Sequence, residues 1–162
     1  MDRGKGKMER LIKVTVNNRG YSLSVTPNTT LSDMLRLNLG LTGTKVGCNV
    51  GDCGACAVIL DGKPVNSCLV LAVQADGKNI LTIEGLGTEE RLDPLQEAFI
   101  ENGAIQCGFC TPGMVLVGKS LIERNPNANE SEIRKAISGN LCRCTGYQKI
   151  VEAIKSVCKS EP

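Results

Sequence analysis

Eight of the nine cysteines of this chain fall into two groups of four, and the chain contains no histidine. The absence of histidine excludes Ser-His-Asp and Cys-His catalytic sets, Cys/His zinc fingers, and histidine-ligated haem or Rieske centres. In a reducing compartment, clustered thiols usually bind metal rather than form disulfides. Any metal site in this chain is therefore expected to be rich in thiolate ligands.

The first group consists of Cys48, Cys53, Cys56 and Cys68. Its first three members follow Cys-x₄-Cys-x₂-Cys, which is the ligand spacing of plant-type [2Fe–2S] centres. Such a cluster is anionic, so backbone N–H groups must point at the sulfur atoms. Glycines at positions 47, 51 and 54 would allow the positive φ angles that aim those groups inward. A structural Cys₄ zinc site is the alternative, although zinc sites usually pair two Cys-x₂-Cys knuckles.

The second group consists of Cys107, Cys110, Cys142 and Cys144. Each pair precedes an expected helix start, at Thr111-Pro112 and at Thr145-Gly146. Helix N-termini would then face the sulfur atoms and stabilise their negative charge. A thioredoxin-like redox pair is the alternative for the first two cysteines, but the surrounding sequence shows no βαβ pattern. The second group therefore predicts another [2Fe–2S] site.

The ninth cysteine, Cys158, belongs to neither group. It lies on the apolar face of the last expected helix, where we expect a small buried side chain.

The apolar pattern predicts an α+β fold with a sheet domain followed by a helical one. Alternation predicts a hairpin over residues 11–25 with a turn at 17–20, a second hairpin over 57–66, and a strand over 79–83, with a helix over 31–39. From residue 93 the period becomes helical, and four short amphipathic helices are expected to form a bundle. We expect a disordered tail at 1–10, an α+β domain at 11–84, a linker at 85–92 and a helical domain at 93–158.

The composition indicates what kind of core the chain has and argues against some classes of partner. Apolar residues make up 41% of the chain and aromatic residues only 2%, so the core is expected to be aliphatic. The net charge of +2, without a basic stripe interleaved with aromatics, argues against a nucleic-acid partner. We find neither a membrane span nor an export signal and expect a cytoplasmic protein.

Three segments carry a family resemblance: GCNVGDCGACAV, IQCGFCTPGM and GNLCRCTGY. With them, the chain from about Leu11 to Val157 closely resembles the small iron–sulfur subunit of the xanthine oxidase family of molybdenum hydroxylases. The resemblance implies a plant-ferredoxin-like β-grasp domain followed by a four-helix bundle with its own cluster. One departure is Ala57, where the family often has threonine beside the first cluster.

The resemblance also implies partners and a role. Molybdopterin is expected in a large subunit and FAD in a medium one, in a heterotrimer or a dimer of heterotrimers. Electrons would pass from the molybdopterin site through the two clusters to FAD or another acceptor. Gln106 and Cys144 are expected beside the molybdopterin. The chain would hold no catalytic residue or substrate site. We expect an aldehyde as substrate of the complex, with carbon monoxide, a purine, nicotinate or an aromatic acyl-CoA as alternatives.

Two other classes of function compete with this interpretation. One is a zinc-stabilised interaction module, which would be colourless, whereas a two-cluster protein would be red-brown. The other is a free-standing ferredoxin. Such carriers usually have a strongly acidic surface for steering, so the charge of +2 argues against this class.

Overall fold

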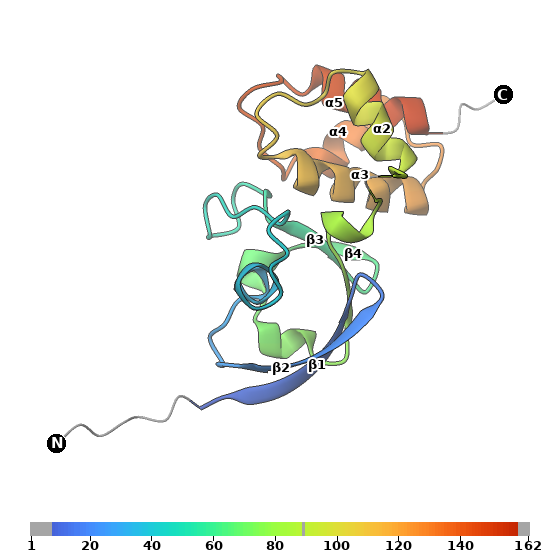
Figure 1. Cartoon of the computed structure of the whole chain (residues 1–162). Helices are drawn as coiled ribbons and strands as arrows, with labels where there is room; N and C mark the ends of the chain where they lie inside the picture. The colour runs from blue at the N-terminus through green and yellow to red at the C-terminus, as the bar shows by residue number, and fades with distance from the viewer. Residues whose placement is uncertain (1–7, 89, 159–162) are drawn as a thin grey trace.

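The computed structural model describes residues 8–88 and 90–158, so most of the expected tail at 1–10 lies outside the described residues. The chain forms a lower part built on a sheet and an upper part built on helices (Figure 1). This is the α+β architecture that the apolar pattern predicts. Within the described ranges, none of the helices has the length and apolar character needed to cross a membrane.

Five strands of the described chain form one mixed sheet in the order β2-β1-β5-β3-β4. β1 and β5 run parallel, and the other neighbouring pairs are antiparallel. The strands are β1 (Arg10–Val16), β2 (Arg19–Val25), β3 (Ala57–Leu60), β4 (Lys63–Asn66) and β5 (Asn79–Leu81).

Both expected hairpins are present, and each closes through two residues with positive φ. Asn17 and Asn18 have φ of 51° and 63°, and the turn of the second hairpin has φ of 46° at Asp61 and 78° at Gly62. Two-residue turns of this kind match the right-handed twist of the strands. The expected turn at 17–20 is therefore too long, because its last two residues already belong to β2. The expected strand at 79–83 is also too long, because a 3₁₀ turn begins at Ile83.

The sheet buries an aliphatic core under a short helical segment. Alternate β1 residues Ile12, Val14 and Val16 are buried, as are Leu31 and Met34 from the segment that covers them. This segment is α1 (Leu31–Asp33), which continues as a π-helical stretch, Met34–Asn38. It begins as expected, with the Thr30 hydroxyl accepting a hydrogen bond of 3.1 Å from the amide of Asp33.

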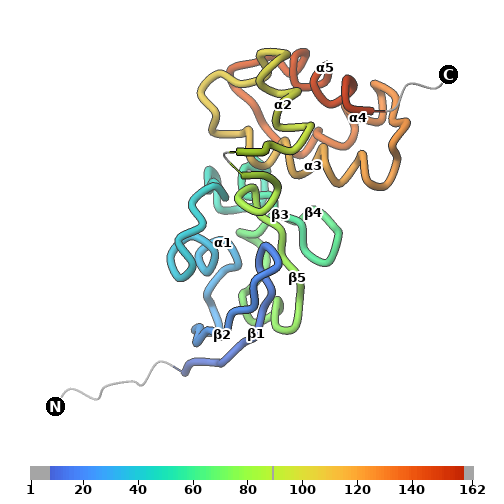
Figure 2. Tube along the Cα trace, turned by 45° about the vertical axis from the view of Figure 1, so that its right-hand side comes forward, coloured from blue at the N-terminus to red at the C-terminus, as the bar shows by residue number. Residues whose placement is uncertain are grey.

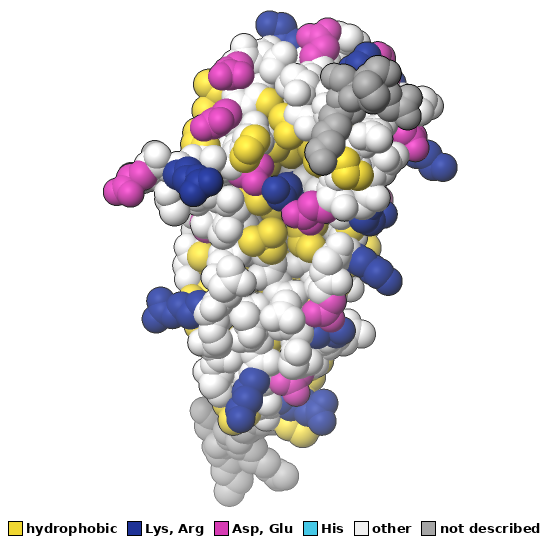
Figure 3. Space-filling model, turned by 90° about the vertical axis from the view of Figure 1, so that its right-hand side faces the viewer, with side chains coloured by type: hydrophobic (Ala, Val, Ile, Leu, Met, Phe, Trp, Pro, Cys, Tyr) yellow, Lys and Arg dark blue, Asp and Glu magenta, His cyan; other side chains and the backbone are white. Residues whose placement is uncertain are grey.

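The upper part is a four-helix bundle consisting of α2 (Pro94–Glu101), α3 (Thr111–Arg124), α4 (Glu130–Ile137) and α5 (Gln148–Val157). Its buried core includes Leu95, Phe99, Met114, Ile133 and Ile150. On the face shown in Figure 3, hydrophobic side chains come to the surface mainly in this helical half. Acidic and basic side chains are interspersed across the same face.

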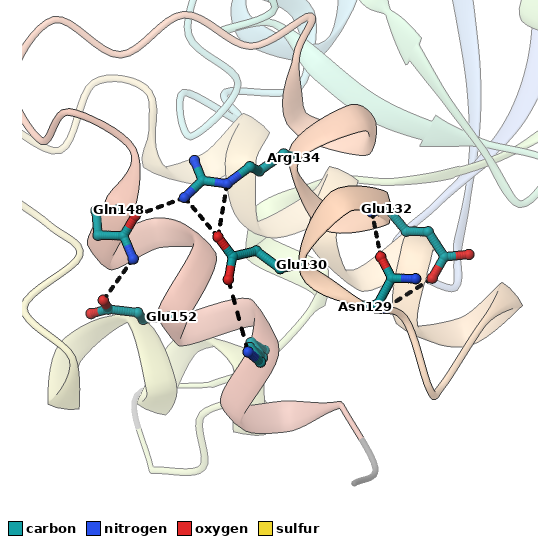
Figure 4. A network of polar contacts seen from close by, with 7 residues as sticks. Asn129, Glu130, Glu132, Arg134, Gln148 and Glu152 are labelled. Atoms are coloured by element: carbon teal, nitrogen blue, oxygen red, sulfur yellow. Dashed lines mark hydrogen bonds and ion pairs between the residues drawn. The ribbon is translucent and has the colours of Figure 1, made fainter. Parts of the chain in front are cut away.

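A polar network holds the start of α5 against α4 (Figure 4). The Arg134 guanidinium donates to Glu130 of its own helix at 2.9 Å and to Gln148, the first residue of α5, at 2.7 Å. At the start of α4, Asn129 and Glu132 form a reciprocal capping box. Exposed contacts of this kind add little stability singly, and here they link the first residue of α5 to α4.

The two parts share packing where β3 meets the bundle. Ala57 of β3 belongs to the buried core of the helices, and Ile83 and Leu86 from the connection pack against the same core. The loop over residues 40–56, drawn in cyan, lies at the end of the sheet part that faces the helices (Figure 2). This placement brings the first cysteine group close to the helical part.

Candidate metal centres

The first cysteine group lies on two segments that the second hairpin brings together. Cys48, Cys53 and Cys56 belong to the loop before β3, and Cys68 belongs to the 3₁₀ turn after β4. Because β4 runs back along β3, the amide of Ser67 reaches the carbonyl oxygen of Cys56 at 3.3 Å. Cys56 and Cys68 are buried, whereas Cys48 and Cys53 are partly exposed.

The loop points backbone amides at one sulfur atom. The N–H groups of Val50, Asp52 and Cys53 lie 3.3–3.4 Å from Cys48 Sγ. The amide of Val50, followed by that of Cys53, lowers the pKa of Cys48 to about 7. Several donors aimed at one sulfur atom favour the thiolate, which is the form that binds metal.

Glycine shapes this loop in two different ways. Gly51 and Gly54 have φ of +88° and +67°, as the sequence predicts. Gly47 is not among the positive-φ residues, so that expectation is wrong for it. Its small size matters instead, because a Cβ atom there would lie 3.1 Å from Cys53 Sγ. Asn49 also has positive φ, which sequence analysis did not identify.

The second cysteine group joins two connections between helices. Cys107 and Cys110 lie between α2 and α3, and Cys142 and Cys144 lie between α4 and α5. Cys110 is buried, whereas Cys107 and Cys144 are exposed. Burial, together with the Cys142 thiol, raises the pKa of Cys110 to about 12.

Only one of the two helix starts expected at this second centre is found where predicted. α3 begins at Thr111, directly after Cys110, as predicted. However, α5 begins at Gln148, three residues later than expected, because Tyr147 before it has a left-handed backbone with φ of +68°. The donors at Cys142 Sγ come instead from a local turn, with the amide of Thr145 at 3.5 Å and its hydroxyl oxygen at 3.1 Å. Burial alone would raise the pKa of Cys142, but the Thr145 contacts, the amide of Cys144 and the Cys110 side chain together outweigh it, and the pKa is lowered.

The thiols within each group affect one another. The Cys53 side chain acts on the pKa of Cys48, and the Cys56 side chain helps burial to raise the pKa of Cys68 to about 11. In the second group, the Cys142 side chain helps burial to raise the pKa of Cys110, and the side chain of Cys107 raises the pKa of Cys144. The thiols of each group are therefore neighbours in the folded chain.

Each group offers a donor set that fits a [2Fe–2S] cluster. Such a cluster takes two protein ligands at each of its two irons, and each group supplies four free cysteines. A Cys₄ zinc site would place four thiolates around one ion. Among residues 8–88 and 90–158, no group of three or more Cys, His, Asp or Glu side chains is arranged to hold a single metal ion.

The remaining predicted site residues lie at the surface or outside the two groups. Gln106 is exposed beside Cys107. On the two connections that carry the second group, three large apolar side chains are exposed, and we call them the apolar rim: Ile105, Phe109 and Leu141. Cys158 caps α5 and packs against the helical core, and its thiol lies 3.4 Å from the carbonyl oxygen of Ile154. Burial raises its pKa, but the side chain is only partly buried, at the edge of the core rather than inside it as expected.

Sequence analysis missed two residues that connect the groups. Asn140 is buried, and its carboxamide donates to the carbonyl oxygen of Gly54 at 2.9 Å. The amide of Leu141 donates to the carbonyl oxygen of Cys53, also at 2.9 Å. Their only signal in the sequence is that they directly precede Cys142.

Comparison with known proteins identifies both parts. Residues 14–82 match the 2Fe-2S iron-sulfur cluster binding domain family, and residues 82–155 match the [2Fe-2S] binding domain family. The fold and the two cysteine groups thus define an iron–sulfur protein with two [2Fe–2S]-binding domains.

Similarity to whole proteins is equally clear. The chain is 49% identical over 144 residues to the nicotinate dehydrogenase small FeS subunit of Eubacterium barkeri, covering 89% of this chain and 92% of that one. It superposes on quinoline 2-oxidoreductase from Pseudomonas putida 86 with a TM-score of 0.88 at 48% identity, covering 91% of each chain. It also superposes on aldehyde oxidoreductase from Desulfovibrio gigas, with a TM-score of 0.89 at 45% identity, covering 92% of this chain but only 17% of that one. The chain belongs to the family of small [2Fe–2S] subunits of molybdenum hydroxylases, which transfer electrons within multi-subunit oxidoreductases.

Proposed function

We propose that eight cysteines ligate two [2Fe–2S] clusters that relay electrons from a molybdopterin site on a large partner subunit to FAD on a medium one. Cys48, Cys53, Cys56 and Cys68 hold one cluster; Cys107, Cys110, Cys142 and Cys144 hold the other. The observation that carries this proposal is that each of the two [2Fe–2S]-binding domains places four free cysteines on two neighbouring segments. When bound, such clusters supply one-electron oxidation and reduction.

In the proposed order, the cluster of the helical domain is next to the molybdopterin. Exposure supports this, because Cys144 and Gln106 are both open to a partner. The apolar rim is exposed on the same two connections, and apolar surface of this kind is typical of protein interfaces. Gln106 and Cys144 would then contact the molybdopterin, and the cluster of the Cys48 loop would pass electrons on to flavin.

The proposal includes the domain boundaries and the compartment. We place the sheet domain at residues 11–84 and the helical domain at 93–158, with a linker at 85–92. This division is supported by the end of β5 at Leu81 and the start of α2 at Pro94. Nine free cysteines suit the reducing cytoplasm.

Metal analysis and spectroscopy test the cluster assignment. The complex purified with its partner subunits should carry iron and acid-labile sulfide in equal amounts on this chain. Reduction should give two distinguishable EPR signals, because one group of thiols lies in a glycine-rich loop and the other between helices. Zinc without iron would overturn the assignment and support the interaction-module alternative.

The substrate is a separate proposal, because we expect the substrate site on the large subunit rather than on this chain. Sequence analysis led us to an aldehyde, and the superposed aldehyde oxidoreductase is consistent with that choice. The names of the other two relatives favour a second candidate, a nitrogen heteroaromatic ring such as those of nicotinate and quinoline. Assaying the complex with an aldehyde and with nicotinate or quinoline separates the two. Turnover of the ring compound alone would overturn the aldehyde proposal.

A further inference from the structure

The two cysteine groups are joined by a buried contact that we call the inter-loop junction, formed by Cys53, Gly54, Gly113, Asn140 and Leu141. The amide of Leu141 donates to the carbonyl oxygen of Cys53 at 2.9 Å. Cys53 belongs to the first group, and Leu141 directly precedes Cys142 of the second. A single hydrogen bond therefore connects the backbone of the two groups.

The junction is too tight for side chains on its glycines. A Cβ atom on Gly54, whose φ is +67°, would lie 2.3 Å from the carbonyl oxygen of Gly139. A Cβ atom on Gly113, in the first turn of α3, would lie 2.8 Å from the carbonyl oxygen of Gly54. The backbones of the two loops are therefore in direct contact, with no space for a side chain between them.

The Asn140 carboxamide fastens this contact. Its Nδ2 atom donates to the carbonyl oxygen of Gly54 at 2.9 Å, and that oxygen also accepts from the amide of Ala57 at 3.0 Å. Asn140 is only 5% exposed. In a buried setting, losing such a donor weakens the contact that it holds, because water does not readily replace it.

We propose that Asn140 is a positioning residue for electron transfer between the two clusters, which it serves by holding the Leu141–Cys53 hydrogen bond closed. This inference rests on the proposed function of the chain. Electrons tunnel better through covalent and hydrogen bonds than across a gap of the same length. In each transfer, one electron leaves the cluster of the helical domain, which is oxidised, and enters the cluster of the Cys48 loop, which is reduced. No proton or other reactant takes part.

The test compares Asn140→Ala with a matched control in the complex purified with its partner subunits. In the control, Asn102→Ala, the lost hydrogen bond also runs from an asparagine Nδ2 to a carbonyl oxygen, that of Ala98 at 2.8 Å, but it lies within the helical domain. A light pulse with a flavin photosensitiser adds one electron, and rapid-freeze EPR follows its redistribution between the clusters. This design needs no knowledge of the substrate.

Asn140→Ala should keep both cluster signals but slow the redistribution about fivefold, as the closed junction becomes less populated. Hydrogen exchange at the Leu141 amide should accelerate, because exchange follows the population of the open junction, and the magnetic interaction between the two reduced clusters should weaken. The Asn102→Ala complex should match the wild type in all three measurements. A merely structural role for Asn140 would leave electron redistribution and the magnetic interaction unchanged.

If Asn140→Ala fails to assemble with both clusters, Asn140→Asp provides the same comparison. It keeps the side-chain volume but places a carboxylate against the carbonyl oxygen of Gly54, so redistribution should again slow. Wild-type redistribution rates in a variant that retains its iron would overturn the role of Asn140. A wild-type complex whose two clusters exchange no electrons would overturn the proposed function itself, and the wild-type measurement alone identifies that case.

Discussion

The ninth cysteine offers the sharpest test of the ligand assignment. Cys158→Ala removes a half-buried thiol at the end of α5, whose contact with the carbonyl oxygen of Ile154 is long, at 3.4 Å. A small trim at the edge of a core costs about 1 kcal/mol. For a chain of this size, that cost corresponds to a fall in Tm of about 2–4 °C. Iron content should not change, because Cys158 belongs to neither group.

Cys53→Ala is the comparison. It removes one thiolate of the first group, so that cluster should be lost and the iron content should fall by half. The assay is iron and sulfide analysis of the purified complex, with EPR to identify which signal disappears and a thermal melt to measure Tm. Loss of iron in Cys158→Ala, or full iron in Cys53→Ala, would show that the ligand sets are wrong.

Four further predictions follow from the same geometry. When the complex is mixed rapidly with substrate, Cys144→Ala should stop reoxidation of molybdenum, whereas Cys53→Ala should still allow reduction of the helical-domain cluster. Normal reduction of the Cys48-loop cluster in the Cys144→Ala complex would refute the proposed order of electron transfer. Asn129→Ala should lose about 1 kcal/mol in a denaturation experiment, because it removes a capping box. In the metal-free chain, alkylation of Cys48 should have its midpoint near pH 7 rather than the ordinary 9.0. Because this pKa is lowered on folding, the thiolate's contribution to stability is complete above about pH 9 and is lost as the pH falls through about 7. An alkylation midpoint near pH 9 would contradict the contacts between the backbone amides and Cys48 Sγ. The chain without its partners should aggregate in light scattering, because the apolar rim is then exposed; a monodisperse monomer would argue against an obligate complex.

Much of this protein is determined by interactions between residues close together in the sequence. The Asn17-Asn18 and Asp61-Gly62 turns and the Asp93 helix cap could be predicted because each depends on the conformational preferences of a few adjacent residues. The same holds for the cysteine spacing, since cluster ligands on one loop must be a few residues apart. The start of α5 was misplaced because the left-handed backbone of Tyr147 is rare for an aromatic residue and leaves no local signal.

Contacts between distant segments were decided only by the tertiary structure. The Asn140 carboxamide and the Gly54 carbonyl oxygen are 86 residues apart, and they meet because Ala57 at the start of β3 packs into the helical core. Glycine at position 47 was predicted to provide a positive φ angle. The structure shows instead that glycine is needed there because Cys53 Sγ, across the loop, leaves little space for a side chain. The sequence alone thus determined which thiols are available and how each loop can turn. Packing of the two parts decided how close the cysteine groups lie, because burial, and not any local preference, brings the two loops together.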